Sequence, residues 1–136
     1  MSESLEHYEY VRRIYNRVKE LVPQDCVGLI KADLFGCEKP SLTYNSFVPD
    51  VMYQNIGCLI IGEAKTLDDF DRIHSYEQYE SYVQECMKFP GETTLVICIP
   101  WQLFITAQNH FIHLKKKYNS KTKVIVMNEI GMEEIV

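Results

Sequence analysis

The chain has 136 residues, of which 46% are hydrophobic and 24% charged, and its formal net charge at pH 7 is −5. That length supplies one hydrophobic core, so we expect a single domain over residues 1–136. No apolar run approaches the length of a transmembrane helix, and the first residues lack the basic and apolar regions of a secretory signal. The sequence therefore predicts a cytoplasmic protein without a membrane partner.

The first predicted element is a helix over residues 4–22. Ser4 can cap its start, an apolar stripe with helical spacing follows, and Pro23 ends it. Residues 26–34 are apolar and alternating, which predicts a first strand, and residues 35–45 contain glycine, proline and serine and predict a loop. The helical stripe comprises His7, Val11, Ile14, Val18 and Leu21.

A β-hairpin is predicted next, over residues 49–65. Its first strand ends near Met52, residues 54–57 (Gln-Asn-Ile-Gly) form the turn, and residues 58–65 form the return strand. Side chains alternate along a strand, so we expect one face to carry Leu59, Ile61, Glu63 and Lys65.

The hairpin register decides which acids meet. If Asn55 and Ile56 form a two-residue loop, Asp50 lies opposite Ile61. Glu63 is then its diagonal neighbour on the same face, roughly 7–8 Å away. Two carboxylates at that spacing can hold a divalent cation between them.

These residue types suit phosphodiester chemistry. Mg²⁺ prefers oxygen ligands and keeps several waters, so the carboxylates of Asp50 and Glu63 and the carbonyl of Ala64 are suitable ligands. A bound cation polarises a phosphodiester and acidifies water, and Lys65 beside it can orient that water or stabilise developing charge. The alternative that stays open is a half-buried hairpin with a merely solvated polar end.

A second helix is predicted after residues 66–69, which can cap it, and it runs to about Met87. Phe70, Ile73 and Val83 contribute to its apolar side. Its other side carries polar residues at steps of three and four, so these share a face. They are Asp71, His74, Ser75, Gln78 and Tyr82.

Two of these patterns resemble a known family. Pro49-Asp50, twelve intervening residues and Glu63-x-Lys65 resemble the PD-(D/E)XK nuclease superfamily. Gln78-x-x-x-Tyr82 resembles the Q-x-x-x-Y signature that RecB-like members carry on the helix after Glu-x-Lys.

The resemblance implies a role for each matching residue. Asp50, Glu63 and Ala64 would bind Mg²⁺ or Mn²⁺, and Lys65 would orient the nucleophile. Gln78 would assist catalysis, and Tyr82 would contact the substrate. Many members carry a further acid on the first helix; here Glu6 and Glu9 both match, and the choice between them stays open. His74 receives no role.

The rest of the chain predicts a strand at residues 95–99, a helix at residues 104–118, a strand at residues 124–127, and a short tail from residue 131. The strand is uniformly apolar, which is typical of the middle of a sheet. The helix carries an apolar stripe of Phe104, Ala107, Phe111 and Leu114.

The resulting order, α-β-β-β-α-β-α-β, is similar to that of the superfamily. The resemblance implies an α/β (α+β) protein with a restriction-endonuclease-like αβββαβ core, a central mixed sheet flanked by helices, and an extra C-terminal helix and strand. It further implies a Mg²⁺-dependent or Mn²⁺-dependent nuclease acting on DNA, with specificity from a homodimer or a partner protein. The alternative is a catalytically silent binding or assembly subunit of a larger DNA-processing complex.

Basic residues cluster in two places, which matters because the acidic net charge argues mildly against a nucleic-acid partner. Each cluster is either a solvated surface or a phosphate track, and the sequence leaves both alternatives open. The early cluster comprises Arg12, Arg13, Arg17 and Lys19, and the late one Lys115, Lys116, Lys117, Lys121 and Lys123.

Overall fold

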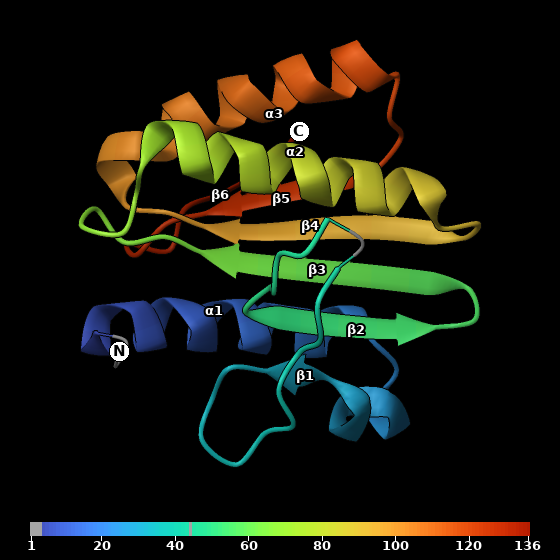
Figure 1. Ribbon diagram of the computed structural model, residues 1–136. Coiled ribbons are helices and arrows are strands. Elements are labelled where there is room, and N and C mark those ends of the chain that lie inside the picture. Colours follow the sequence, from blue (N-terminus) through green and yellow to red (C-terminus); the bar gives the residue numbers. More distant parts are fainter. Residues whose placement is uncertain (1–3, 44) are drawn as a thin grey trace.

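A six-stranded mixed sheet flanked by helices forms the protein (Figure 1), seen in a computed structural model that describes residues 4–43 and 45–136. The α/β class is therefore confirmed. The strands β3, β4 and β5 are parallel, and the remaining pairs are antiparallel. In the order of the chain, which is also their order in the sheet, the strands are β1 (Lys31–Ala32), β2 (Val51–Asn55), β3 (Cys58–Ala64), β4 (Glu92–Cys98), β5 (Lys123–Met127) and β6 (Glu133–Ile135).

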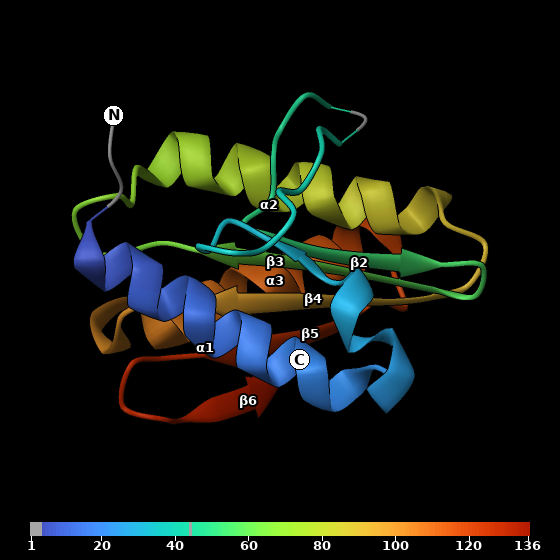
Figure 2. The same ribbon diagram turned by 90° about the horizontal axis from the view of Figure 1, so that it is seen from below.

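The helices cover both faces of the sheet: α1 (Leu5–Leu21) lies on one face, and α2 (Arg72–Lys88) and α3 (Phe104–Tyr118) lie on the other (Figures 1 and 2). Side chains of β4 alternate between the two cores. Val96 and Cys98 pack with α1, whereas Leu95 and Ile97 pack with α2 and α3. Burial on both faces explains the continuous apolar run in this strand.

The helices at the two ends of the chain agree with their predictions. Ser4 caps α1, because its hydroxyl accepts the His7 N–H at 3.0 Å, and all of the predicted stripe except Leu21 is buried. The helix α3 has the predicted bounds, and its whole predicted stripe is buried. No helix within residues 4–43 and 45–136 has the length and apolar character needed to cross a membrane.

The predicted first strand is mostly wrong. Residues 24–29 form a 3₁₀ helix, η1 (Gln24–Leu29), and only Lys31 and Ala32 pair with β2. Pro23 starts this turn, because its carbonyl accepts the Cys26 N–H at 2.9 Å. A proline has the dihedral angle of a tight turn already set, so the apolar residues that follow curl instead of extending.

The helix α2 begins later than predicted. Its N-cap is Asp71, whose carboxylate accepts the His74 N–H at 3.0 Å, whereas residues 66–69 form a separate turn closed by Thr66. Ile73 was expected on the apolar side but is 73% exposed. The buried side includes Tyr79, Tyr82, Val83 and Cys86 instead.

The C-terminal tail contains a strand, β6, that was not predicted. It pairs with β5 although its residues are all exposed. The Asn128 carboxamide oxygen accepts the N–H groups of Ile130 and Met132 and reverses the chain there. A short exposed edge strand lacks the alternating apolar pattern from which a strand is predicted.

Candidate functional site

The hairpin brings Asp50 and Glu63 to the same end of adjacent strands. Its two-residue loop is Ile56-Gly57, so the predicted loop was displaced by one residue. Val51 pairs with Gly62, and one step further Asp50 is level with Glu63 instead of diagonal to it. The Asn55 side chain decides this, because its carboxamide oxygen accepts the Gly57 N–H at 2.9 Å.

Both carboxyl groups are buried and satisfied from within the protein. Asp50 is 9% exposed, and its Oδ2 accepts the Ala64 N–H at 2.9 Å. Glu63 is 4% exposed, and its Oε1 accepts the Tyr82 hydroxyl at 2.7 Å. The two residues are level with each other across the β2–β3 pair, so their carboxyl groups lie side by side.

Glu63 is the carboxyl group whose ionised form is disfavoured. Burial raises the pKa of Glu63 well above its usual range, and the neighbouring Asp50 carboxylate raises it further. The ammonium of Lys65 and the hydroxyl of Tyr82 act in the opposite direction without outweighing burial.

Lys65 lies on the same side as Glu63, as predicted. Its Nζ is 3.9 Å from Glu63 Oε2, and its side chain is only 12% exposed. Its backbone N–H donates to the Cys98 carbonyl at 3.1 Å, which joins the end of β3 to the end of β4. The backbone of Lys65 is thus fixed to β4, and its ammonium lies beside Glu63.

One residue of α1, His7, contacts Asp50. Its Nε2 lies 3.4 Å from Asp50 Oδ2, and the residue is 5% exposed. Glu6 and Glu9, the two candidates from the sequence, are both exposed, and Glu9 pairs with Arg12 at 3.0 Å. A histidine within an apolar stripe needs a buried polar partner, and that was the signal in the sequence.

Gln78 and Tyr82 extend the site into α2. Tyr82 is fully buried, and burial followed by the charge of Glu63 raises its pKa, so the phenol stays protonated as a donor. Gln78 lies one turn before Tyr82 on α2, and its Oε1 is buried without a partner among the described residues. The observed contact of Tyr82 is thus with Glu63, and its contact with a substrate stays a prediction.

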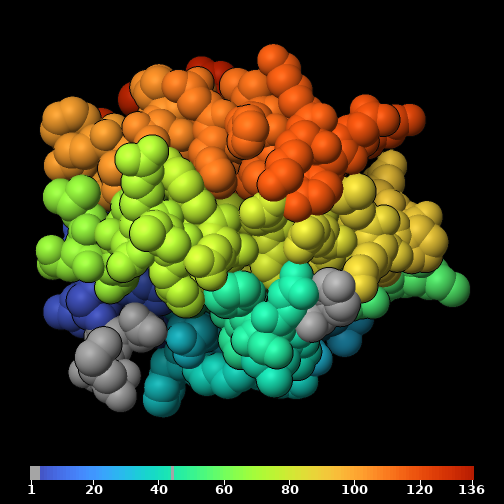
Figure 3. Space-filling view, turned by 45° about the horizontal axis from the view of Figure 1, so that its top comes forward, coloured from blue at the N-terminus to red at the C-terminus, as the bar shows by residue number. Residues whose placement is uncertain are grey.

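The part of the chain after residue 44 and before β2 packs against α2 (Figure 3). The Asn45 carboxamide donates to Gln84 at 3.1 Å. The ring of Phe47 lies 5.7 Å from that of His74 and 6.4 Å from that of Tyr82. His74 therefore packs against Phe47.

The donor types at the site fit a hard cation. Residues 4–43 and 45–136 contain no cluster of three or more His, Cys, Asp or Glu side chains arranged as a metal centre. The predicted set has only two carboxylates and the Ala64 carbonyl, which points to the same strand as the Ala64 N–H that binds Asp50. The orphaned Gln78 Oε1 is a further oxygen of the kind that Mg²⁺ prefers.

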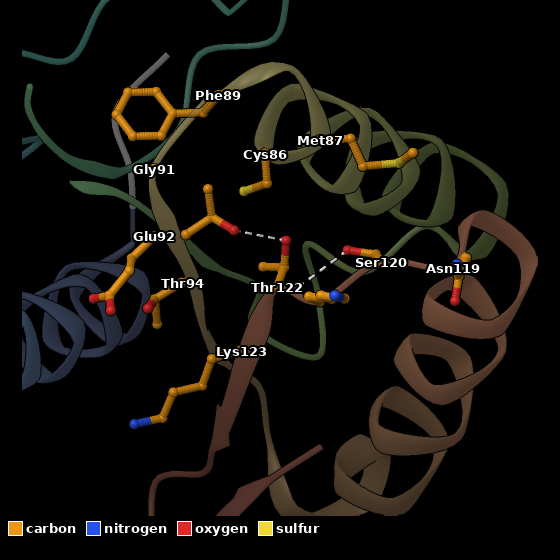
Figure 4. Close-up of a pocket in the computed structure, with 12 residues that line it drawn as sticks. Cys86, Met87, Phe89, Gly91, Glu92, Thr94, Asn119, Ser120, Thr122 and Lys123 are labelled. Atoms are coloured by element: carbon orange, nitrogen blue, oxygen red, sulfur yellow. Dashed lines mark hydrogen bonds between the residues drawn. The ribbon is translucent and has the colours of Figure 1, made fainter. Parts of the chain in front are cut away.

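The late lysine cluster lies away from the acids. Lys121 and Lys123 line a groove of about 660 Å³ at the starts of β4 and β5, where Thr93 and Thr122 hydrogen-bond at 2.8 Å (Figure 4). Glu63 is level with Ile97 in the sheet, four residues beyond Thr93, which is roughly 13 Å along the strand. This groove is therefore separate from the acid site.

The chain was compared with protein-family models, with curated protein sequences and with solved structures, and no match was found. The assignment of a function therefore depends on the geometry of the site.

Proposed function

We propose that this protein is a metal-dependent nuclease that hydrolyses DNA phosphodiester bonds with Mg²⁺- or Mn²⁺-activated water. The observation that carries the proposal is the placement of two buried acids, Asp50 and Glu63, level with each other on adjacent strands, with the Lys65 ammonium 3.9 Å from Glu63. The order of helices and strands supports a restriction-endonuclease-like αβββαβ core with an added C-terminal helix and two strands.

The cost of the arrangement favours a functional role. Two carboxyl groups buried together repel each other, and burial disfavours the ionised form of Glu63. A hydrophobic pair would stabilise the same corner of the sheet better. Carboxyl groups with such raised pKa values are concentrated at catalytic and ligand-binding sites.

The roles of the residues follow from their contacts. Asp50, Glu63 and the Ala64 carbonyl would hold the cation, which when bound supplies positive charge to the phosphate and acidity to a water. Tyr82 fixes the rotamer of Glu63 through its hydroxyl. Lys65 faces the same space and would stabilise negative charge on the phosphate in the transition state.

The two remaining polar groups act on the edges of this space. His7 holds Asp50 in place from α1 and is close enough to join the ligands of the cation. Gln78 presents an amide oxygen, without a partner among the residues that the structure describes, that would orient the attacking water or a phosphate. The small size of the domain favours specificity from a homodimer or a partner protein.

A second candidate is a catalytically silent nuclease-fold subunit that binds or assembles within a DNA-processing complex. One observation favours it: Asp50 and Glu63 are already satisfied by Ala64, His7 and Tyr82 without a cation. Under this alternative the buried network would serve stability or assembly alone.

The experiment that separates the two candidates is incubation of plasmid, single-stranded and branched DNA with Mg²⁺ or Mn²⁺, with and without chelator. The nuclease predicts cleavage that requires the cation and disappears in Asp50→Asn. Lys121→Gln, at the far end of the sheet, is the matched control and retains activity. Absence of cation-dependent cleavage on every substrate would leave the silent subunit.

A further inference from the structure

Three residues at the start of α1 organise the surroundings of the acid pair. His7 contacts Asp50. The Tyr8 hydroxyl accepts the N–H of Phe35 at 3.1 Å. The Tyr10 hydroxyl donates to Glu129 at 3.4 Å, and Glu129 in turn accepts the N–H of Trp101 at 2.8 Å. The first two turns of α1 thus contact the acid pair and also fix the backbone of two aromatic residues, Phe35 and Trp101.

Phe35 is a solvent-exposed aromatic residue on a turn that is fixed by hydrogen bonds. It is 94% exposed. The turn is closed by the Cys37 N–H, which donates to the Leu34 carbonyl at 3.2 Å, and Gly36 supplies the positive φ of +84° that it requires. The Asp33 N–H donates to the Asp50 carbonyl at 2.8 Å, so the turn is directly attached to the acid site.

Trp101 is a second exposed aromatic residue, on the opposite side of the acid pair from Phe35. It is 58% exposed and starts the 3₁₀ helix η2 (Trp101–Leu103). It follows Cys98 by three residues, and the Cys98 carbonyl accepts the N–H of Lys65. Figure 1 shows the turn after β1 and the segment after β4 on either side of the end of β3.

The charges near this end of the sheet are unsuited to a long duplex. On the Phe35 side, Lys39 pairs with Asp33 and Lys31 pairs with Glu38, both at 3.4 Å. Cations already paired with carboxylates neutralise few phosphates. Exposed aromatic rings, by contrast, bind the flat faces of bases, which are covered in a duplex and accessible in a single strand.

We propose that Phe35 and Trp101 stack with unpaired bases on either side of the phosphodiester held at Asp50 and Glu63, so that the substrate is single-stranded or locally unpaired DNA. This inference rests on the proposed nuclease function and specifies its substrate class. Braced aromatic rings are suited to this, because little conformational freedom is lost when a base stacks on them.

Trp101 is the only tryptophan of the chain, so its fluorescence reports on the site directly. The protein is titrated with oligothymidylate in chelator, where no cleavage occurs. We expect quenching of the fluorescence, no quenching by an abasic strand of the same length, and weaker binding of a blunt duplex. Phe35→Ala, followed through the same tryptophan, weakens oligothymidylate binding by about 5- to 150-fold.

The matched control is Ile56→Ala at the tip of the β2–β3 turn, at the opposite end of the hairpin. Ile56 is fully exposed, and its replacement leaves binding unchanged. Circular dichroism checks that each variant folds. Equal binding of the oligothymidylate and the abasic strand, equal binding of single strand and duplex, or an unchanged affinity of Phe35→Ala would each overturn the inference.

The outcome is separable from that of the nuclease proposal. Quenching by oligothymidylate without cation-dependent cleavage would refute the nuclease and retain the stacking site. Cleavage of duplex and single strand at equal rates, with no quenching, would retain the nuclease and refute the stacking site.

Discussion

Tyr82 donates its hydroxyl to Glu63 at 2.7 Å, and Tyr79, one turn earlier on α2, has a buried hydroxyl without a partner among the described residues. The two phenols are therefore a matched pair. Both are fully buried on the same helix, and only one of them touches the acid site.

Tyr82→Phe is expected to destabilise the protein by about 1–3 kcal/mol, because Glu63 would be left buried with one donor fewer. Tyr79→Phe removes an unsatisfied hydroxyl and is expected to be neutral or stabilising. Denaturant unfolding of the two variants measures the difference. Equal losses of stability would show that the Tyr82–Glu63 hydrogen bond contributes nothing.

The metal-free protein is expected to lose stability as the pH rises. The pKa of Glu63 is raised in the folded state and is about 4.3 in the unfolded chain. Below about pH 4.3 Glu63 is protonated in both states, and between the two pKa values only the folded state keeps the proton. The contribution of Glu63 to the free energy of unfolding therefore falls from about pH 4.3 up through the folded pKa.

Glu63→Gln removes this contribution. The variant is expected to be more stable than the wild type at neutral pH without cation and to show a flatter pH dependence. The comparison is made by urea unfolding in chelator from pH 4 to pH 8. A wild-type protein whose stability rises over that range in parallel with the variant would contradict a buried, protonated Glu63.

Cation binding is expected to stabilise the protein and to release a proton. A cation that binds only the folded state adds about 2.7 kcal/mol at one hundred times its dissociation constant. Because Glu63 must lose its proton to bind the cation, the affinity increases with pH. Thermal unfolding during a Mn²⁺ titration at two pH values measures both effects.

Asp50→Asn serves as the control for that titration. It is expected to remove most of the stabilisation by Mn²⁺ and to raise the metal-free stability slightly, because the repulsion from Glu63 is gone. An unchanged melting temperature of the wild type across the titration would count against the metal site.

Lys65→Ala tests the chemical step. The ligands of the cation remain, so the fold and much of the Mn²⁺ affinity are expected to persist. Cleavage is expected to fall roughly 10²–10³-fold, the scale for losing one preorganised charge partner in a transition state. Rates are compared at matched DNA occupancy, with chelator as control. Equal rates for the two proteins would leave Lys65 without a catalytic role.

His7→Gln identifies the contribution of the first helix. His7 contacts Asp50, so its replacement is expected to lower both Mn²⁺ affinity and the cleavage rate. Glu6→Gln and Glu9→Gln are exposed controls on the same turn and are expected to change neither. A loss of Mn²⁺ affinity in either glutamate variant, with His7→Gln unaffected, would reverse the assignment.

Local patterns were sufficient for much of the fold. The stripe from Phe104 to Leu114 predicted α3 with its observed bounds, because burial on one side of a helix leaves a mark in the sequence. The hairpin that carries Asp50 and Glu63 was also predicted from a local pattern. Side chains alternate along a strand, which places Glu63 and Lys65 on one face. The register was displaced by one residue, because the side chain of Asn55 forms its own turn.

The helices, most of the strands and the two carboxylates with their lysine could be predicted from the sequence, since each depends on residues close together in the chain, whereas η1 and β6 were missed. The distant side chains that contact these residues could be identified only once the fold was known. His7 is 43 residues from Asp50 and contacts it because α1 packs on the face of the sheet against β2 and β3. The lysines near residue 121 are brought to the opposite end because β5 is parallel to β4. Such contacts depend on packing between elements, and no pattern of neighbouring residues encodes them.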